Sequence, residues 1–234
     1  MKTLKFLAVS AMVVIALILG IQSTSHALIK LYLSDGGAPI ILADGDLGDL
    51  AAGEGAVTFS GAIGNWVVNV TTGISYPVLG SPGIPYLDLN SVNVTSQNGG
   101  ELTVAAAQTG FTMFDPISGV AGPFTLEVGG TTSGEVEFDV WLNKNNLYPW
   151  DDGGVTFDFL SFDGTPFSGT ATGTVNGVTA PYCLALRADI LHEGAGASSF
   201  DAELQGKVPE PISLILLGSG LAGAGLVRRF RKSK

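Results

Sequence analysis

Cysteine and histidine are nearly absent from this sequence, and their scarcity limits both its covalent structure and its chemistry. Cys183 is the single cysteine, so no disulfide can form within the chain and the fold must rest on its apolar core. His192 is the only histidine after position 26, and no G-x-S-x-G nucleophile elbow occurs. We therefore expect no enzymatic activity, with His192 as a structural residue near a strand end and a hydrolase as the least favoured class.

Basic residues are also few through the long middle of the chain. Residues 28–208 hold four Lys and Arg against twenty Asp and Glu, which gives this part a net charge near −16. A body so acidic repels phosphate backbones, which excludes nucleic acid as a natural partner. The same charge favours solubility and attracts cations or basic partners.

Long stretches with a helical apolar period are missing from the body, whereas glycine is abundant, at 33 of 234 residues. The glycines separate short stretches rich in Val, Thr, Ile and Phe, a pattern typical of many strands joined by tight turns. The sequence predicts an all-β fold, an antiparallel β-sandwich, with a β-barrel as the alternative. Ten strands are expected, at 56–61, 65–72, 86–96, 101–107, 124–128, 134–142, 155–162, 168–175, 181–193 and 199–205.

Two of these segments show the period of two that places one face on a core. The core face of GEVEFDVWL carries Val136, Phe138, Val140 and Leu142, and its other face carries Glu135, Glu137, Asp139 and Trp141. PYCLALRADILHE alternates in the same way, with Arg187 and Asp189 away from the core. In YLDLNSVNVTS the apolar register changes between Leu89 and Val92, so we expect a β-bulge near Asn90 and Ser91.

The N-terminal segment has the three parts of a secretory signal peptide. Lys2 and Lys5 precede an apolar run at 6–21, and Ser25 and Ala27 put small residues at the third and first positions before a cleavage site. We expect a signal helix within residues 1–27, cleaved after Ala27. A permanent N-terminal anchor is the alternative.

The last apolar run, at residues 212–227, follows Pro209-Glu210-Pro211. As a helix it would span about 24 Å, less than the ~30 Å hydrocarbon core of a bilayer. Basic side chains after it can snorkel to the headgroups and fix the cytoplasmic end. We therefore predict a single transmembrane helix with the body outside, stopped by Arg228, Arg229, Arg231 and Lys232.

These three parts together, VPEP, ISLILLGSGLAGAGLV and RRFRKSK, resemble the PEP-CTERM sorting domain of exported Gram-negative proteins. By position, Pro209, Glu210 and Pro211 are the sorting motif and Arg228–Arg231 the basic stop. The resemblance implies recognition by exosortase, an integral membrane protease, and association with exopolysaccharide and biofilm. The body segments VTFSGAIGNWVVNVTTG, LDLNSVNVTS, VGGTTSG and GAGASSFDAEL resemble a recurrent class of PEP-CTERM proteins with no established activity.

Aromatic residues in and near the polar loop NNLYPWDDGG form the best candidate binding site. Tyr148 and Trp150 lie in this loop, and Trp141 points to the acidic face of its strand. Aromatic faces beside carboxylates and amides suit a sugar, whose CH groups stack while its hydroxyls form hydrogen bonds. Loop residues that fold back on the core are the alternative interpretation.

Asp44–Asp49, DGDLGD, concentrates carboxylates but departs from the spacing of a calcium loop, since Gly48 takes the fifth position and no Glu closes the twelfth. We interpret it as a solvated turn, with weak Ca²⁺ binding as the alternative, and expect neither a resident metal nor another cofactor.

We expect three parts in the chain: a signal peptide at 1–27, a β-sandwich domain at 28–207 and a sorting segment at 208–234. The predicted protein is non-catalytic, exported, transiently anchored in the inner membrane and then placed at the outer surface or in the matrix. A carbohydrate-binding module is the alternative function.

Overall fold

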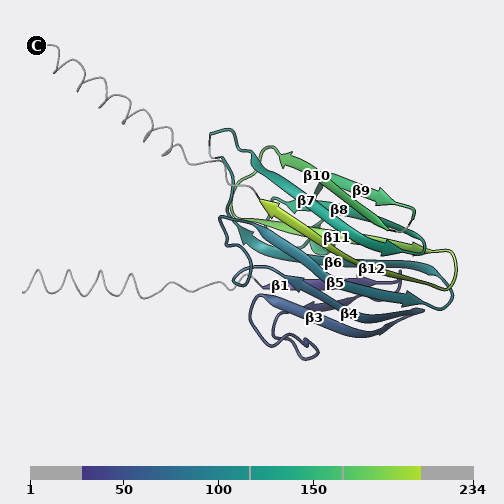
Figure 1. Ribbon diagram of the computed structural model, residues 1–234. Helices are drawn as coiled ribbons and strands as arrows, with labels where there is room; N and C mark the ends of the chain where they lie inside the picture. The colour runs from purple at the N-terminus through teal and green to yellow at the C-terminus, as the bar shows by residue number, and fades with distance from the viewer. Residues whose placement is uncertain (1–27, 116, 165, 207–234) are drawn as a thin grey trace, which may run out of the picture.

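The computed structural model describes residues 28–115, 117–164 and 166–206, which form a sandwich of two six-stranded antiparallel sheets (Figure 1). This confirms the all-β sandwich. Sheet A has the order β2-β1-β6-β11-β8-β9 and sheet B the order β10-β7-β12-β5-β4-β3. Sheet A consists of β1 (Ile29–Ser34), β2 (Ile40–Ala43), β6 (Gly100–Phe111), β8 (Glu135–Asn143), β9 (Val155–Phe162) and β11 (Tyr182–His192). Sheet B consists of β3 (Ala56–Ile63), β4 (Trp66–Ile74), β5 (Tyr86–Ser96), β7 (Ala121–Thr132), β10 (Phe167–Val175) and β12 (Gly196–Gly206).

All ten predicted strands are present, and the sequence analysis missed two. β1 and β2 are short and form one edge of sheet A, directly after the predicted cleavage site. In β1 the side chains of Ile29, Leu31 and Leu33 are fully buried. Alternation over six residues is enough to fix its register beside β6.

The core lies between the sheets and is built by the alternation that the sequence shows. In β8 the four predicted core residues are fully buried, and Phe138 packs edge-on against Phe200 of sheet B with ring centroids 5.0 Å apart. Each large apolar side chain buried in this way contributes roughly 1.5–3 kcal/mol to folding. Because alternate side chains of each strand point into this core, the side chains between them point to the outer face of the sheet.

A β-bulge lies at the predicted place in β5. The pairing of β12 with β5 passes from Phe200–Val92 to Ala202–Leu89, so Asn90 and Ser91 lie opposite Asp201 alone. Ser91 has a positive φ of 56°, and its N–H donates to Asp201 Oδ1 over 2.6 Å. This extra residue lets both apolar registers of β5 face the core.

The two ends of the sandwich differ in the length of their connections. The long connections lie at the end where β1 begins and β12 finishes, which we call the tail end (Figure 1). They run over 44–55, 75–85, 112–120, 144–154 and 176–181, and one contains the single-turn helix α2 (Pro149–Asp152). At the opposite end, the connections have five residues or fewer.

Within the described part of the chain, no helix has the length and apolarity that a membrane span needs. The predicted signal peptide, the sorting tripeptide, the apolar run and the basic stop all lie outside the described residues.

Candidate functional site

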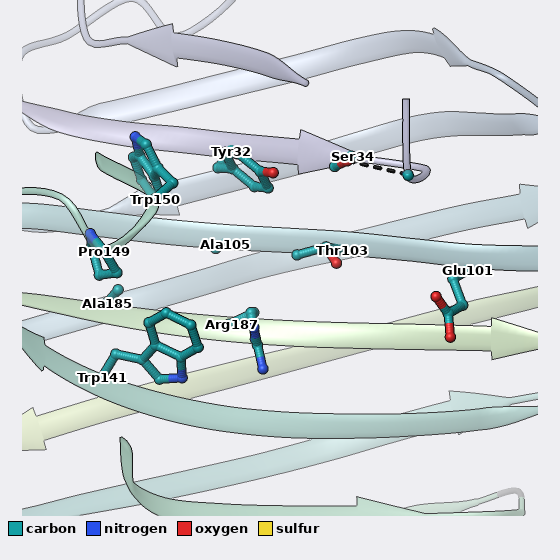
Figure 2. A pocket seen from close by; sticks show the side chains of 11 residues that line it. Tyr32, Ser34, Glu101, Thr103, Ala105, Trp141, Pro149, Trp150, Ala185 and Arg187 are labelled. Carbon is teal, nitrogen blue, oxygen red and sulfur yellow. Dashed lines mark hydrogen bonds between the residues drawn. The ribbon is translucent and has the colours of Figure 1, made fainter. Parts of the chain in front are cut away.

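A groove of about 290 Å³ lies on the outer face of sheet A (Figure 2). We call it the aromatic groove. It is lined by Tyr32, Ser34, Gly36, Glu101, Thr103, Ala105, Trp141, Pro149, Trp150, Ala185 and Arg187. These residues come from β1, β6, β8, β11 and the β1–β2 and β8–β9 connections, so segments far apart in the sequence build one surface.

Small residues on the two central strands form the floor of the aromatic groove. Ala105 of β6 lies in a row between Tyr32 of β1 and Arg187 of β11. In the next row, Ala185 of β11 lies beside Trp141 of β8. Alanine leaves open space above the sheet that larger side chains would fill, and the flanking aromatic residues border that space.

One wall of the groove is a stack of aromatic rings. Trp150 stacks on Tyr32 and on Tyr148, with ring centroids 5.2 Å apart in both pairs and interplanar angles of 21° and 12°. Lys30 Nζ lies 4.2 Å from the centroid of Tyr148, whose hydroxyl donates to Leu28 O. Burial raises the pKa of Tyr148 to about 12, so it remains a neutral donor. Tyr148 thus supports Trp150 from outside the groove lining.

Asn143, at the end of β8, holds the connection that presents Trp150. Its Oδ1 accepts hydrogen bonds from the N–H groups of Asn145 and Leu147, and its Nδ2 donates to Gly153 O. Pro149 then begins α2, where its fixed φ suits the first helical turn. Because Asn143 is buried, these bonds fix the connection and hence the position of the indole.

Trp141 forms the other wall and lies beneath a cation. The guanidinium carbon of Arg187 is 4.5 Å from the centroid of its ring, within the range of a cation–π contact. Trp141 Nε1 is buried without a hydrogen-bond partner among the described residues. Buried polar atoms usually have a hydrogen-bond partner, so this indole donor is an exception in the described structure.

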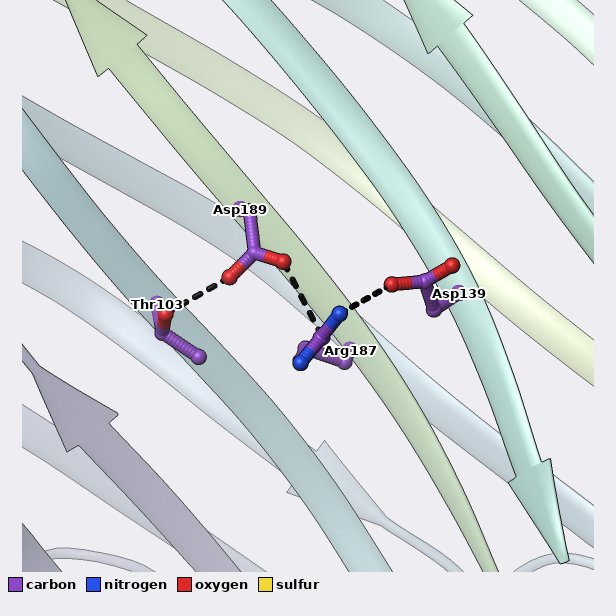
Figure 3. A network of polar contacts seen from close by, with 4 residues as sticks. All are labelled: Thr103, Asp139, Arg187 and Asp189. Carbon is purple, nitrogen blue, oxygen red and sulfur yellow. Dashed lines mark hydrogen bonds and ion pairs between the residues drawn. The ribbon is translucent and has the colours of Figure 1, made fainter. Parts of the chain in front are cut away.

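A polar network follows the aromatic walls along the sheet (Figure 3). Arg187 pairs with Asp139 on one side and lies 3.0 Å from Asp189 on the other, measured from Nε to Oδ2. Thr103 Oγ1 donates to Asp189 Oδ1 over 2.6 Å. The arginine is therefore matched by two carboxylates, and the network is fixed across three strands.

Beyond this network the surface becomes acidic. A second hollow shares Glu101 and Thr103 with the aromatic groove and continues past Glu135, Glu137 and Asp189. The outer face of sheet A thus changes from aromatic near the tail end to acidic near the opposite end (Figure 2).

The three residues predicted to bind sugar, Trp141, Tyr148 and Trp150, all pack on one small apolar cluster that includes Cys183 and Ala185. Two of them line the groove and Tyr148 does not. The sequence analysis missed Tyr32, because β1 was not predicted, and it missed the floor alanines. The alternation of β6 and β11 places these alanines on the outer face, and this was the signal in the sequence that could have identified them.

Cys183 and His192 are both buried and neither lines the groove, although Cys183 belongs to the apolar cluster on which Trp141 and Trp150 pack. Burial raises the pKa of the Cys183 thiol, which disfavours the reactive thiolate. His192 contacts two hydroxyls, Ser96 Oγ at Nδ1 and Ser198 Oγ at Nε2, both over 2.8 Å. Burial lowers the pKa of His192, so the neutral imidazole joins the sheets in a hydrogen-bonded network.

The carboxylates of Asp44–Asp49 accept backbone hydrogen bonds. Asp49 accepts from Gly45, Ala51 and Thr58, and Asp46 accepts from Ala43. This is the arrangement of a capped turn, whereas the sequence predicts only a solvated one. Across the residues that the structure describes, no group of three or more His, Cys, Asp or Glu is placed to hold a metal ion.

Comparison with solved structures gives low similarity to carbohydrate-binding modules. TmCBM61 in complex with β-1,4-galactotriose has 11% identity and a TM-score of 0.32, over 63% of this chain and 92% of that one. The CBM36-1 domain of a xylanase from the hindgut metagenome of Trinervitermes trinervoides has 14% identity and a TM-score of 0.28, over 66% and 99%. The CBM6 of LamC from Zobellia galactanivorans has 14% identity and a TM-score of 0.28, over 65% and 99%. TM-scores this low do not establish a shared fold, so neither architecture nor ligand is taken from these modules.

No curated protein matches the chain. Comparison with protein families matches residues 207–232 to the PEP-CTERM protein-sorting motif. The matched range begins directly after β12 and contains the predicted tripeptide and basic stop. The chain therefore carries a PEP-CTERM protein-sorting motif, which marks it as an exported protein and an exosortase substrate.

Proposed function

We propose that this protein is a non-catalytic, exported surface or matrix protein whose sandwich binds polysaccharide in the aromatic groove. The observation that supports this is the placement of Tyr32 and Trp150 on one side of an alanine floor and Trp141 on the other. From β1 to β8 there are three inter-strand spacings, about 14 Å in all. This is the separation of the two strand backbones, and the alanine floor lies between them.

The chemistry of the lining matches the two sides of a sugar. Pyranose CH groups pack on aromatic rings, while hydroxyls need donors and acceptors at the edge of the same surface. The groove supplies Ser34, Thr103 and Arg187 for the hydroxyls. These groups lie on paired strands of one sheet, so little conformational entropy is lost when a ligand binds.

The charge of the surface narrows the class of glycan. Arg187 is already paired with Asp139 and Asp189, and the groove continues into Glu101, Glu135 and Glu137. A uronate or sulfated chain would meet like charge along this path. We therefore propose a neutral polysaccharide, or one that carries ammonium groups on amino sugars.

Affinity electrophoresis of the full chain tests this proposal. Gels would contain a neutral glucan, a neutral galactan, a partly deacetylated amino-sugar polymer or a polyuronate. The detergent must lack a sugar headgroup, because a maltoside would compete for the groove. We expect retardation by at least one neutral or amino polymer and none by the polyuronate. Equal mobility in every gel, or retardation by the polyuronate alone, would contradict the proposal.

The sorting motif would bring this groove to the cell surface, where exopolysaccharide is the available glycan. We propose that Pro209, Glu210 and Pro211 are read by exosortase and that Arg228, Arg229, Arg231 and Lys232 stop transfer. Replacing the tripeptide by three alanines should leave export intact and block processing of the tail. Intact-mass analysis of protein from an exosortase-containing strain decides this, since an identical C-terminus in both proteins would contradict it.

A further inference from the structure

Exposed aliphatic side chains gather at the tail end of the sandwich. Leu47 and Ile117 are almost completely exposed, at 105% and 95% of their reference areas. These two residues lie on different connections. Four further aliphatic side chains at this end are about half exposed: Leu50, on the same connection as Leu47, and Val78, Ile84 and Leu147, on other connections.

The opposite end has nothing comparable. Its connections cover 35–39, 64–65, 97–99, 133–134, 163–166 and 193–195, and their sequences contain no Val, Leu, Ile, Met or aromatic residue. Exposed aliphatic residues scattered singly over a surface need no explanation, but concentration at one end of a molecule indicates an interaction surface.

The chain leaves the sandwich among these same connections. Gly206, the last residue of β12, donates its N–H to Pro85 O in the 75–85 connection. The sorting motif begins at the next residue, and its apolar run begins at Ile212. Six residue steps reach at most about 20 Å, even when fully extended. While the tail is anchored, the tail end of the sandwich must stay within that distance of the bilayer.

We propose that the tail end rests on the lipid surface, with the tips that carry Leu47 and Ile117 inserted at the boundary between headgroups and acyl chains. Separate tips that each present one or two aliphatic side chains can enter a fluid interface without a shaped partner. The carboxylates of Asp46 and Asp49 lie in the same region and favour lipids without net negative charge. This inference rests on the anchored sorting motif and is independent of glycan binding.

Lipid quenching of site-specific probes tests the proposal on the full chain. Gly53 at the tail end and Gly194 at the opposite end have open space around an added Cβ, so each accepts cysteine. The native Cys183 is buried, so a thiol-reactive fluorophore labels the introduced residue. Labelled protein would be reconstituted into phosphatidylcholine vesicles that contain brominated lipid. We expect several-fold stronger quenching for the Gly53→Cys probe than for the Gly194→Cys probe.

A matched pair of variants assigns the quenching to the aliphatic tips. Adding Leu47→Ser and Ile117→Ser to the Gly53→Cys protein should remove most of the difference. Adding Leu191→Ser, an exposed leucine near the opposite end, should leave it unchanged. Equal quenching at the two positions, no effect of the double substitution, or failure of the full chain to float with vesicles would overturn the proposal. A concentration-dependent dimer with an unquenched Gly53→Cys probe would assign this end to a second copy instead.

Discussion

The outer faces of the two sheets follow the same alternation and differ in what it exposes. Sheet A presents aromatic walls, an alanine floor and Arg187 between two carboxylates. Sheet B places Asp88, Glu203 and Glu127 side by side on neighbouring strands, and none of its six strands contains Lys or Arg. One face can therefore pair its charges, whereas the other relies on solvent and salt to screen them.

This difference shows where an all-β domain can place a site without altering its core. The inner faces of both sheets are mainly apolar, with a few buried polar residues such as His192, so the fold is largely indifferent to what the outer rows carry. Sheet A becomes a candidate binding surface through one arginine, two alanines and one connection fixed by Asn143. Each of these can be changed separately, which makes the comparison testable.

The largest effect should come from making sheet A resemble sheet B. Arg187→Met removes the cation beside Asp139, a carboxylate that is only 5% exposed. An uncompensated buried charge is costly, and because Arg187 is partly open to solvent we expect a loss of about 2–3 kcal/mol in the free energy of unfolding. Urea unfolding monitored by tryptophan fluorescence measures it.

The double variant Arg187→Met with Asp139→Leu is the control for this prediction. Replacing both partners by apolar residues removes the unpaired charge, so most of the lost stability should return. A double variant as unstable as Arg187→Met alone would show that the arginine acts through packing on Trp141 and that the charge pair is secondary.

A smaller effect on stability is expected from the neighbouring carboxylates on sheet B, Asp88, Glu203 and Glu127. Burial, with nearby Glu203, raises the pKa of Asp88 to about 6, above its ordinary 3.8. The native state therefore binds more protons than the unfolded state between about pH 4 and 6, and stability falls as the pH rises through that window. Allowing for solvent screening, lowering the pH from 7 to 5 should stabilise the protein by about 1 kcal/mol.

Melting temperature against pH, measured for the protein and for Asp88→Asn, checks the sign. Asp88→Asn should melt at a higher temperature than the unmodified protein at pH 7. Its melting temperature should rise much less than that of the unmodified protein when the pH is lowered to 5. Glu193→Gln, on a short connection at the opposite end, is the control. This variant should be stabilised by acidification as much as the unmodified protein is. A pH profile for Asp88→Asn that matches the unmodified protein would remove Asp88 from the explanation.

The smallest effect concerns salt. Raising sodium chloride from 0.01 to 0.1 M shortens the Debye length from ~30 to ~10 Å and should raise the melting temperature by about 1–2 °C. Because the DGDLGD carboxylates are engaged by backbone N–H groups, calcium chloride of equal ionic strength should give the same shift. A larger shift in calcium would mean specific binding and would contradict the capped-turn interpretation.

The sequence was a good guide wherever structure follows from local alternation. The core faces of β8 and β11, the bulge at Asn90 and Ser91, and the outward position of Trp141 all follow from the period of two. The pairing of strands did not follow, because β1, β6, β11 and β8 are adjacent in space and scattered along the chain. A predicted site that depends on such pairing is incomplete until the topology is known.

The aromatic site illustrates this limit. Trp150 could be proposed from its polar loop, but its stacking on Tyr32 requires β1, which the sequence analysis missed. The role of Asn143 as the residue that fixes the loop is also invisible in sequence, since its three hydrogen bonds return to residues two to ten positions further on. The kinds of side chain in the site were predictable from the sequence, but the contacts among them were not.

Calorimetric titration of Trp150→Ala with an oligosaccharide from a polysaccharide that retards the full chain tests the central claim most directly. The account predicts at least tenfold weaker binding, about 1.4 kcal/mol, with partial recovery in Trp150→Phe. Tyr86→Ala removes an aromatic side chain from the outer face of sheet B and should leave the affinity unchanged. Unchanged affinity in Trp150→Ala, or a loss only in Tyr86→Ala, would show that the groove on sheet A is not the glycan site.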